Sequence, residues 1–266
     1  MAKNAVAKKS STAVADGAAF SEFAGAGLEN VEASDLLIPR LAILQALSPQ
    51  CNPNKPEHIE GATPGQICDV GLGELLTSPA LFLPVHFSKV WIEWAPRNTG
   101  KGLVAIHPDN SVLADCKPDD KGKPIVQVGD RKGNYVAETA QFFGFNLSSN
   151  SQMCFIPMTS SQLKNSRKLN TLASSEKAVD SNGNEFTPPL FYRTYELSVA
   201  AESNNDGDWF GWKVDRGPLL QELDGWEAML ERAVKFRDQI KSGEATADVG
   251  SMDEASGGNN DPDGAM

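Results

Sequence analysis

Three basic residues, Lys164, Arg167 and Lys168, lie in the stretch MTSSQLKNSRKLNTL (158–172), which contains no carboxylate. Their spacing of three and four positions places them on one face of a helix. The apolar residues share a second face, which is formed by Met158, Leu169, Leu172 and Ala173, with Leu163 at its margin. A rigid element that carries point charges and short polar side chains can bind a phosphate backbone. A solvated surface helix without a ligand would show the same pattern, so the rest of the chain must distinguish the two.

Aromatic residues alternate with basic residues in other segments, namely WIEWAPRNTGKG (91–102), FYRTY (191–195) and DWFGWK (208–213), and KPDDKGK (117–123) and DRKGNY (130–135) are further basic turns. Rings stack on bases and cations bind phosphates, so this composition is typical of proteins that bind single-stranded nucleic acid. The candidate phosphate contacts are Lys164, Arg167, Lys168, Arg97, Lys101 and Arg193, and the candidate stacking residues are Trp91, Trp94, Tyr192 and Trp212. Aromatic residues on strands are more often buried than exposed, so we expect about half of the five tryptophans to be structural.

The sequence offers little for catalysis. The three histidines are far apart, and NTGKG (98–102) lacks the first glycine and the last hydroxyl residue of a P-loop. The acids Asp109, Asp119 and Asp120, followed by Lys121, match a loose metal-dependent nuclease pattern, but they lie in Pro/Gly-rich turns. We therefore predict a binding protein that is not an enzyme and needs no metal or cofactor, and we keep a nuclease as the third hypothesis.

The elements that would position these residues are mainly strands. Apolar and aromatic runs predict a long strand at 81–94, with a bulge or two buried faces, and hairpins at 134–147/152–158 and 190–203/208–214, and short strands are expected at 66–70, 102–106 and 124–128. We expect helices in the basic stretch, capped by Thr159 or Ser160, and within 217–241, divided at Asp224-Gly225 with Asp224 as N-cap of the longer part. The segment 36–47 fits either a helix or a buried strand. The predicted fold is α+β, mainly antiparallel β, as an OB-like barrel or curved sheet with one basic helix and a C-terminal helix.

The chain has 266 residues, of which 40% are hydrophobic, and a formal charge of -11. Residues 243–266 contribute six acids and no Lys or Arg, so much of the negative charge belongs to this segment. We predict three regions: a mostly disordered arm (1–33), a single β-rich nucleic-acid-binding domain (34–242) and an acidic disordered tail (243–266). No apolar run is long enough to span a membrane, and the four cysteines form no CxxC pair, so we expect reduced thiols and a cytoplasmic location.

The segments PRLAILQALSPQ, IEWAPRNTGKGLV, SRKLNTL and PPLFYRTYELSVAAESNNDGDWFGW resemble a family of tailed-phage proteins encoded among replication genes, over roughly residues 34–215. That family is associated with single-stranded DNA binding. A β-rich body followed by an acidic C-terminus is also similar to the layout of T7-type single-stranded DNA-binding proteins. This tail ends Asp263-Gly264-Ala265-Met266, whereas such tails usually end in an aromatic residue.

The resemblance implies non-sequence-specific binding of single-stranded DNA in phage replication or recombination, inside the host cytoplasm. It also implies that the acidic tail competes with DNA for the basic surface and contacts replication proteins such as a polymerase or a primase-helicase. A second hypothesis is a non-catalytic structural or host-interaction phage protein, in which the basic patches are incidental and the tail confers solubility. The sequence leaves a homodimer open.

Overall fold

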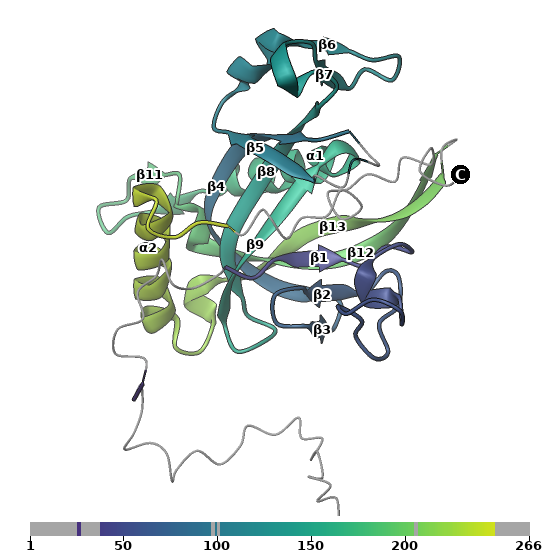
Figure 1. Cartoon of the computed structure of the whole chain (residues 1–266). Helices are drawn as coiled ribbons and strands as arrows, with labels where there is room; N and C mark the ends of the chain where they lie inside the picture. Colours follow the sequence, from purple (N-terminus) through teal and green to yellow (C-terminus); the bar gives the residue numbers. More distant parts are fainter. Residues whose placement is uncertain (1–25, 28–37, 97–98, 100–101, 205–206, 248–266) are drawn as a thin grey trace, which may run out of the picture.

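A long antiparallel sheet forms the centre of the molecule (Figure 1). The computed structural model describes residues 26–27, 38–96, 99, 102–204 and 207–247. Within them, the sheet runs in the order β13 (Gly207–Leu219), β12 (Arg193–Asn204), β4 (Ala80–Trp94), β8 (Tyr135–Asn146), β7 (Pro124–Val126) and β6 (Cys116–Pro118). Two more strands extend it, because β5 (Leu103–His107) pairs with the end of β4, and β9 (Gln152–Thr159) pairs with β8.

The sheet curls because its long strands change neighbours along their length. The first residues of β4 pair with β12 and its last residues pair with β5, with a register shift between Pro84 and His86. A second sheet, β1 (Leu41–Ile43), β2 (Ile67–Asp69) and β3 (Glu74–Leu76), lies against the open side. Arg40 forms a bridge with Phe155 in β9, and the Gln45 side-chain amide exchanges two hydrogen bonds, 2.9 and 3.0 Å long, with the Phe210 backbone in β13. The segment 38–45 therefore links β9 to β13.

Apolar side chains cover both faces of the sheet. On β8, Phe142 belongs to an inner cluster and Phe143 and Phe145 belong to an outer one, as the period-two geometry of a strand requires. Helix α1 (Leu163–Ser174) closes the inner cluster with Leu169, and α2 (Trp226–Ser242) covers the outer cluster with residues that include Phe236. Between the phenylalanines, Gly144 leaves no room for a Cβ, which would contact the Leu83 carbonyl oxygen and the Phe82 ring.

A small lobe projects from one end of the sheet (Figure 1). This upper lobe, residues 108–134, has its own cluster of Val112 and Val126 with Val136 of β8. Its elements are η4 (Asn110–Asp115), β6, β7 and η5 (Gly129–Arg131). The remaining short elements are β10 (Ala178–Val179), β11 (Glu185–Phe186), η3 (Pro49–Cys51), η6 (Ser160–Gln162), η7 (Leu190–Tyr192) and η8 (Leu220–Glu222).

The α+β fold class with a curved antiparallel sheet is confirmed, and so are both predicted hairpins and the three short strands. The ambiguous segment 36–47 contains the short strand β1. The predicted arm and tail lie outside the described residues except for 26–27 and 243–247. No helix in the described part of the chain is long and apolar enough to cross a membrane.

Both predicted helix caps are wrong. Thr159 still belongs to β9, and its hydroxyl donates to the Glu138 carbonyl over 2.8 Å. The short helix η6 intervenes, so α1 begins at Leu163, and neither η6 nor α1 has a side-chain cap. Gly225 (φ 70°), and not Asp224, is the N-cap of α2, which begins at Trp226. The first part of the segment 217–241 is not helical, because strand pairing carries β13 as far as Leu219. There the tertiary pairing overrides the helical periodicity of the sequence.

Candidate nucleic-acid interface

Helix α1 carries its cations on the solvent side and its apolar residues in the core, as the sequence predicts. Leu169 is fully buried in the inner cluster, and Leu163, Leu172 and Ala173 pack against the same cluster. Lys164, Arg167 and Lys168 are exposed. Core packing therefore fixes the orientation of the helix and with it the orientation of the cationic side.

Two of the three cations have acidic partners on the β12–β13 hairpin. Lys164 Nζ lies 2.8 Å from Glu202 Oε2, and Lys168 Nζ lies 3.3 Å from Asp215 Oδ1. Asp215 also pairs with Lys213, whose hydrogen bond, with that of Lys168, holds the pKa of the Asp215 carboxyl below its ordinary value. These partners lie 38 and 47 residues from the lysines in sequence. The Arg167 side chain makes no hydrogen bond or ion pair with another residue in the described ranges.

An indole ring lies beside the first of these pairs. Trp209 Nε1 donates to Glu202 Oε2 over 3.1 Å, so an ammonium and an indole meet at one carboxylate oxygen. Trp209 and Phe210 are each half-buried. Gly211 permits this close approach, because a Cβ there would lie 2.5 Å from Glu202 Oε1 and 2.6 Å from Gln162 Nε2.

The candidate list omitted Trp209, and strand alternation could have identified it. Odd-numbered residues of β13 share one face, on which Gly211 approaches Gln162 and Asp215 pairs with Lys168. Even-numbered residues face the inner cluster, which includes Trp212 and Val214. A period-two count from Lys213 therefore places Trp209 beside the basic helix.

A cleft of about 310 Å³ opens beside the beginning of α1. Its walls come from the β6–β7 turn, the first residues of β8 and the junction of β9 with α1. The lining residues are Trp94, Lys121, Gly122, Lys123, Pro124, Tyr135, Val136, Ala137, Glu138, Thr159, Ser160 and Leu163. Leu163 in this lining is the first residue of α1, so the cleft lies at the beginning of the basic helix.

Two of the candidate stacking residues are buried. Trp94 is 3% exposed and packs in the outer cluster, and Trp212 is 4% exposed and packs in the inner one. Their rings fill the core, so neither can present a face to a base, and we leave both out of the stacking surface. Trp91 is half-buried against the upper lobe, with Lys89 Nζ 6.0 Å from its ring centroid.

Two further candidates, Arg193 and Tyr192, have structural contacts within the fold. Arg193 donates to Glu176 Oε1 over 2.9 Å and to the Gly217 carbonyl over 2.7 Å, which ties β12 to the chain after α1. Tyr192 lines a small apolar pocket of about 110 Å³ beside α2. Arg97 and Lys101 lie outside the described residues.

Two acids of the nuclease pattern, Asp109 and Asp119, stabilise the turns in which they lie. Asp109 Oδ1 accepts from the Ser111 N–H over 2.9 Å, and Asp119 Oδ1 accepts from the N–H groups of Lys121 and Lys123 over 3.0 and 2.7 Å. No group of three or more His, Cys, Asp or Glu side chains in the described ranges is arranged to hold a metal ion. The structure thus gives Asp109 and Asp119 turn-forming contacts.

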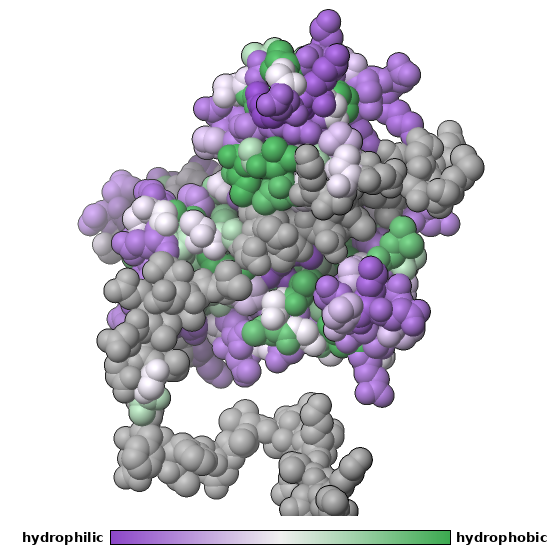
Figure 2. Space-filling view, in the orientation of Figure 1, coloured by the Kyte–Doolittle hydropathy of each residue, from purple (hydrophilic) through white to green (hydrophobic). Residues whose placement is uncertain are grey.

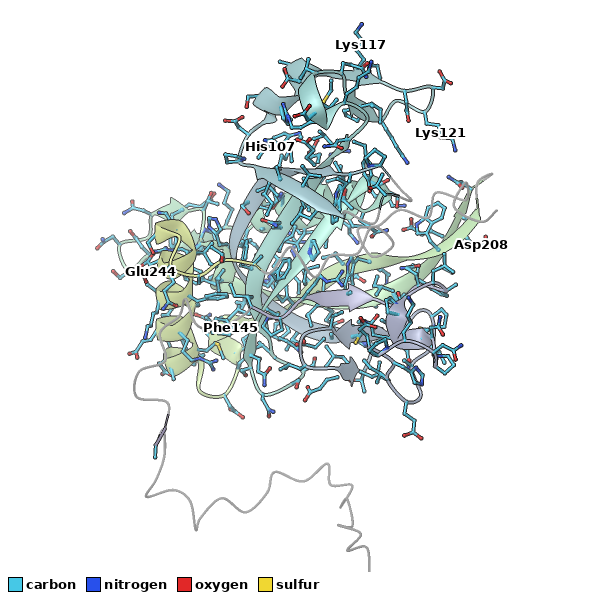
Figure 3. All side chains as sticks on the ribbon, in the orientation of Figure 1. His107, Lys117, Lys121, Phe145, Asp208 and Glu244 are labelled. Atoms are coloured by element: carbon cyan, nitrogen blue, oxygen red, sulfur yellow. The ribbon has the colours of Figure 1, made fainter. Side chains whose placement is uncertain are left out.

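A buried carboxylate, which the sequence did not reveal, joins the upper lobe to the sheet. The Glu93 side chain has no exposed area, and it accepts from Asn134 Nδ2 over 2.6 Å and from Arg131 Nη1 over 2.8 Å. His107 Nε2 lies 2.9 Å from the same carboxylate, and Figure 3 shows this histidine where the lobe meets the sheet. Burial by itself raises the pKa of Glu93, but these hydrogen bonds outweigh burial and leave the pKa below its ordinary value.

Comparison with known protein families shows which family the chain belongs to. The family model described as Pam3 phage gp34-like protein matches residues 7–246. The chain belongs to this phage protein family. Neither a search of curated proteins nor a search of solved structures gave a match. The family match therefore supports a phage protein, as the sequence resemblance implied, and carries no statement about what the protein binds.

Proposed function

We propose that this phage protein binds single-stranded DNA without sequence specificity during DNA replication or recombination, as a binding module without catalysis. The observation that carries the proposal is the meeting of Lys164 Nζ and Trp209 Nε1 at Glu202 Oε2, at 2.8 and 3.1 Å. A cation for a phosphate and an indole for a base are thereby held on one surface. Arg167 and Lys168 continue the cationic side along α1.

The α1 lysines are compatible with this function because the side chains of Lys164 and Lys168 are 58% and 45% exposed. Their carboxylate partners differ, since the Asp215 side chain is 45% exposed and the Glu202 side chain only 15%. An exposed pair such as Lys168–Asp215 stabilises a protein by only about 0–1 kcal/mol, so a phosphate can replace Asp215 at small cost. Release of counterions from the DNA then favours binding, which makes the affinity strongly dependent on salt.

The acidic tail would modulate the same surface. Residues 243–266 hold six acids and no base, and a segment of this charge competes with phosphates for the α1 lysines. We place the protein in the host cytoplasm, where the tail would also contact replication proteins such as a polymerase or a primase-helicase.

A fluorescence titration of the tryptophans with oligo(dT) at two salt concentrations tests the proposal. The first variant replaces Lys164, Arg167 and Lys168 by Gln, because charge reversal would also set new acids against Glu202 and Asp215. It should lose most of the binding, and the slope of log K against log salt should become shallower by about 2, from about 0.7 for each lost single-strand phosphate contact.

The control variant also removes three exposed positive charges, those of Lys55, Lys235 and Lys241, which lie outside α1. It should keep the salt slope of the unchanged protein. Equal losses in both variants would mean that overall charge, and not the α1 surface, attracts DNA. If the unchanged protein does not bind oligo(dT), the proposed function is wrong.

One observation favours the alternative of a structural or host-interaction protein. Strand β5 pairs only with β4 among the described strands, and it exposes Val104 and Ile106 at 42% and 44%. Figure 2 shows a hydrophobic patch in this region, below the hydrophilic surface of the upper lobe. An exposed apolar edge strand is a template for pairing with another chain. Absence of DNA binding in the titration would favour this alternative.

A further inference from the structure

The cleft beside α1 has the size of a site for one small ligand. Its volume of about 310 Å³ lies at the lower end of the range of about 300–1,000 Å³ that small-molecule sites occupy. A duplex is far too wide for such a space, whereas a single nucleotide whose base has left its stack can enter it.

The floor of the cleft is apolar and aromatic. Tyr135 and Trp94 pair across β8 and β4, and both line the cleft together with Leu163. Trp94 is almost fully covered, so the half-buried Tyr135 supplies the accessible ring. An aromatic ring can stack on a nucleobase, and an aliphatic side chain can pack against it.

Two lysines line the wall that the upper lobe contributes. The turn that carries them is closed by the Asp119 carboxylate, which accepts from the backbone N–H groups of both Lys121 and Lys123. Two backbone bonds, from Asp119 N to the Lys123 carbonyl and from Gly122 N to the Asp119 carbonyl, complete the turn at 2.8 and 2.9 Å. The lysines therefore start from a fixed backbone, which lowers the entropy lost when they bind an anion.

The two walls together fit a ligand with a planar uncharged ring and an attached anion. We propose that the cleft binds a single nucleotide of the DNA strand, with the base against Tyr135 and Leu163 and a phosphate at Lys121 and Lys123. This inference rests on the proposed function, and it adds a fixed subsite to an otherwise non-specific surface. The adjoining Lys164 would contact the phosphate of the next nucleotide.

The subsite explains a preference for single strands in physical terms. A base can occupy the cleft only after it has left its neighbours, and a duplex would have to unstack and unpair to supply one. The cationic side of α1 alone would attract single- and double-stranded DNA alike, because both carry phosphates.

Three variants test the subsite with an oligo(dT) that contains one 2-aminopurine, whose fluorescence reports stacking. Tyr135→Leu removes the ring and keeps apolar volume, and a second variant changes Lys121 and Lys123 to Ala. The control is Lys117→Ala, which removes an exposed lysine from the same lobe. Figure 3 shows Lys117 pointing away from the body, whereas Lys121 lies at the end of the β6–β7 turn.

Binding of the unchanged protein should quench 2-aminopurine. Tyr135→Leu should abolish the quenching and weaken binding about tenfold, in the range measured for loss of one stacked base. The lysine pair variant should weaken binding several-fold and Lys117→Ala less than twofold.

Each other outcome is informative. If the unchanged protein binds oligo(dT) but both cleft variants bind and quench as it does, the subsite is wrong and the proposed function stands. If the unchanged protein does not bind oligo(dT) at all, both fail. Should Tyr135→Leu not fold, as judged by its circular dichroism, the lysine pair against Lys117→Ala decides alone, because these side chains lie at the surface of the lobe.

Discussion

Replacing Glu93 by Ala should destabilise the protein by about 3 kcal/mol. The substitution removes the acceptor of Asn134, which is 7% exposed, and leaving such a buried donor unpaired costs about 1–3 kcal/mol. Arg131 loses one partner but keeps Asp115 at 2.7 Å, and its side chain is 38% exposed, so water can solvate it. The total therefore falls at the low end of the roughly 3–5 kcal/mol expected for breaking a buried ion pair.

Thermal unfolding followed by circular dichroism and calorimetry measures this effect. For a chain of this size, each kcal/mol shifts Tm by roughly 2–4 °C, so Glu93→Ala should lower Tm by about 6–12 °C. Glu138→Ala is the matched control, because Glu138 also lies 2.8 Å from a cation, Lys89, but its side chain is 34% exposed. That control should cost less than about 1 kcal/mol. Equal shifts in the two variants would refute the reasoning, since burial would then not determine the cost.

The same carboxylate predicts a dependence of stability on pH. The folded-state pKa of Glu93 lies below its ordinary 4.5, so in the interval between the two values the unfolded chain binds more protons than the folded one. The contribution of Glu93 is therefore present above the ordinary pKa and is lost as the pH falls through the folded-state pKa. Glu93→Gln should flatten this part of the stability curve. An unchanged acid limb in the Gln variant would show that other carboxylates cause the acid loss.

Three further predictions concern binding and packing. Asp215→Asn should tighten oligo(dT) binding about twofold at low salt, since the exposed Lys168–Asp215 pair competes by roughly 0.5 kcal/mol, and weaker binding in a titration would contradict this. Deletion of residues 248–266 spares the buried Ala245 and should tighten binding at low salt but not at high salt, whereas unchanged low-salt affinity would exclude competition by the tail. Gly144→Ala should destabilise the protein by about 3 kcal/mol or more in chemical denaturation, because the new methyl meets backbone, and a cost below about 1 kcal/mol would contradict that packing.

Local signals were sufficient to predict most of the fold. The turn sequences SSNS and NNDG lie between runs of β-forming residues, and the structure places a hairpin at each. The two faces of α1 follow from spacing alone, because a helix fixes the angle between successive residues. The Thr159 cap failed for a tertiary reason, because this residue pairs with a neighbouring strand. Strand pairing likewise holds the residues up to Leu219, and no local pattern encodes these partners.

The candidate site was less accessible to sequence reasoning because its contacts join distant segments. The carboxylates that meet Lys164 and Lys168 come from a hairpin 38 and 47 residues away. Whether a strand tryptophan is core or surface depends on which face of the curled sheet it occupies, and Trp212 and Trp209 differ only in that phase. In the sequence, Glu93 is an ordinary charged residue between Ile92 and Trp94, and only its contacts with the upper lobe show that it is a buried acceptor.

The basic helix α1 has no acid nearby in the sequence, but the fold brings Glu202 and Asp215 to it from the β12–β13 hairpin. Leu169, and not the ion pairs, holds the helix against the core, so Lys164 and Lys168 can exchange one anion for another while α1 stays in place. In the proposed function, phosphates would take the positions near these ammonium groups that Glu202 and Asp215 occupy. Because the helix and the hairpin need not refold, binding of a strand would require only that phosphates replace these two carboxylates as partners of the lysines.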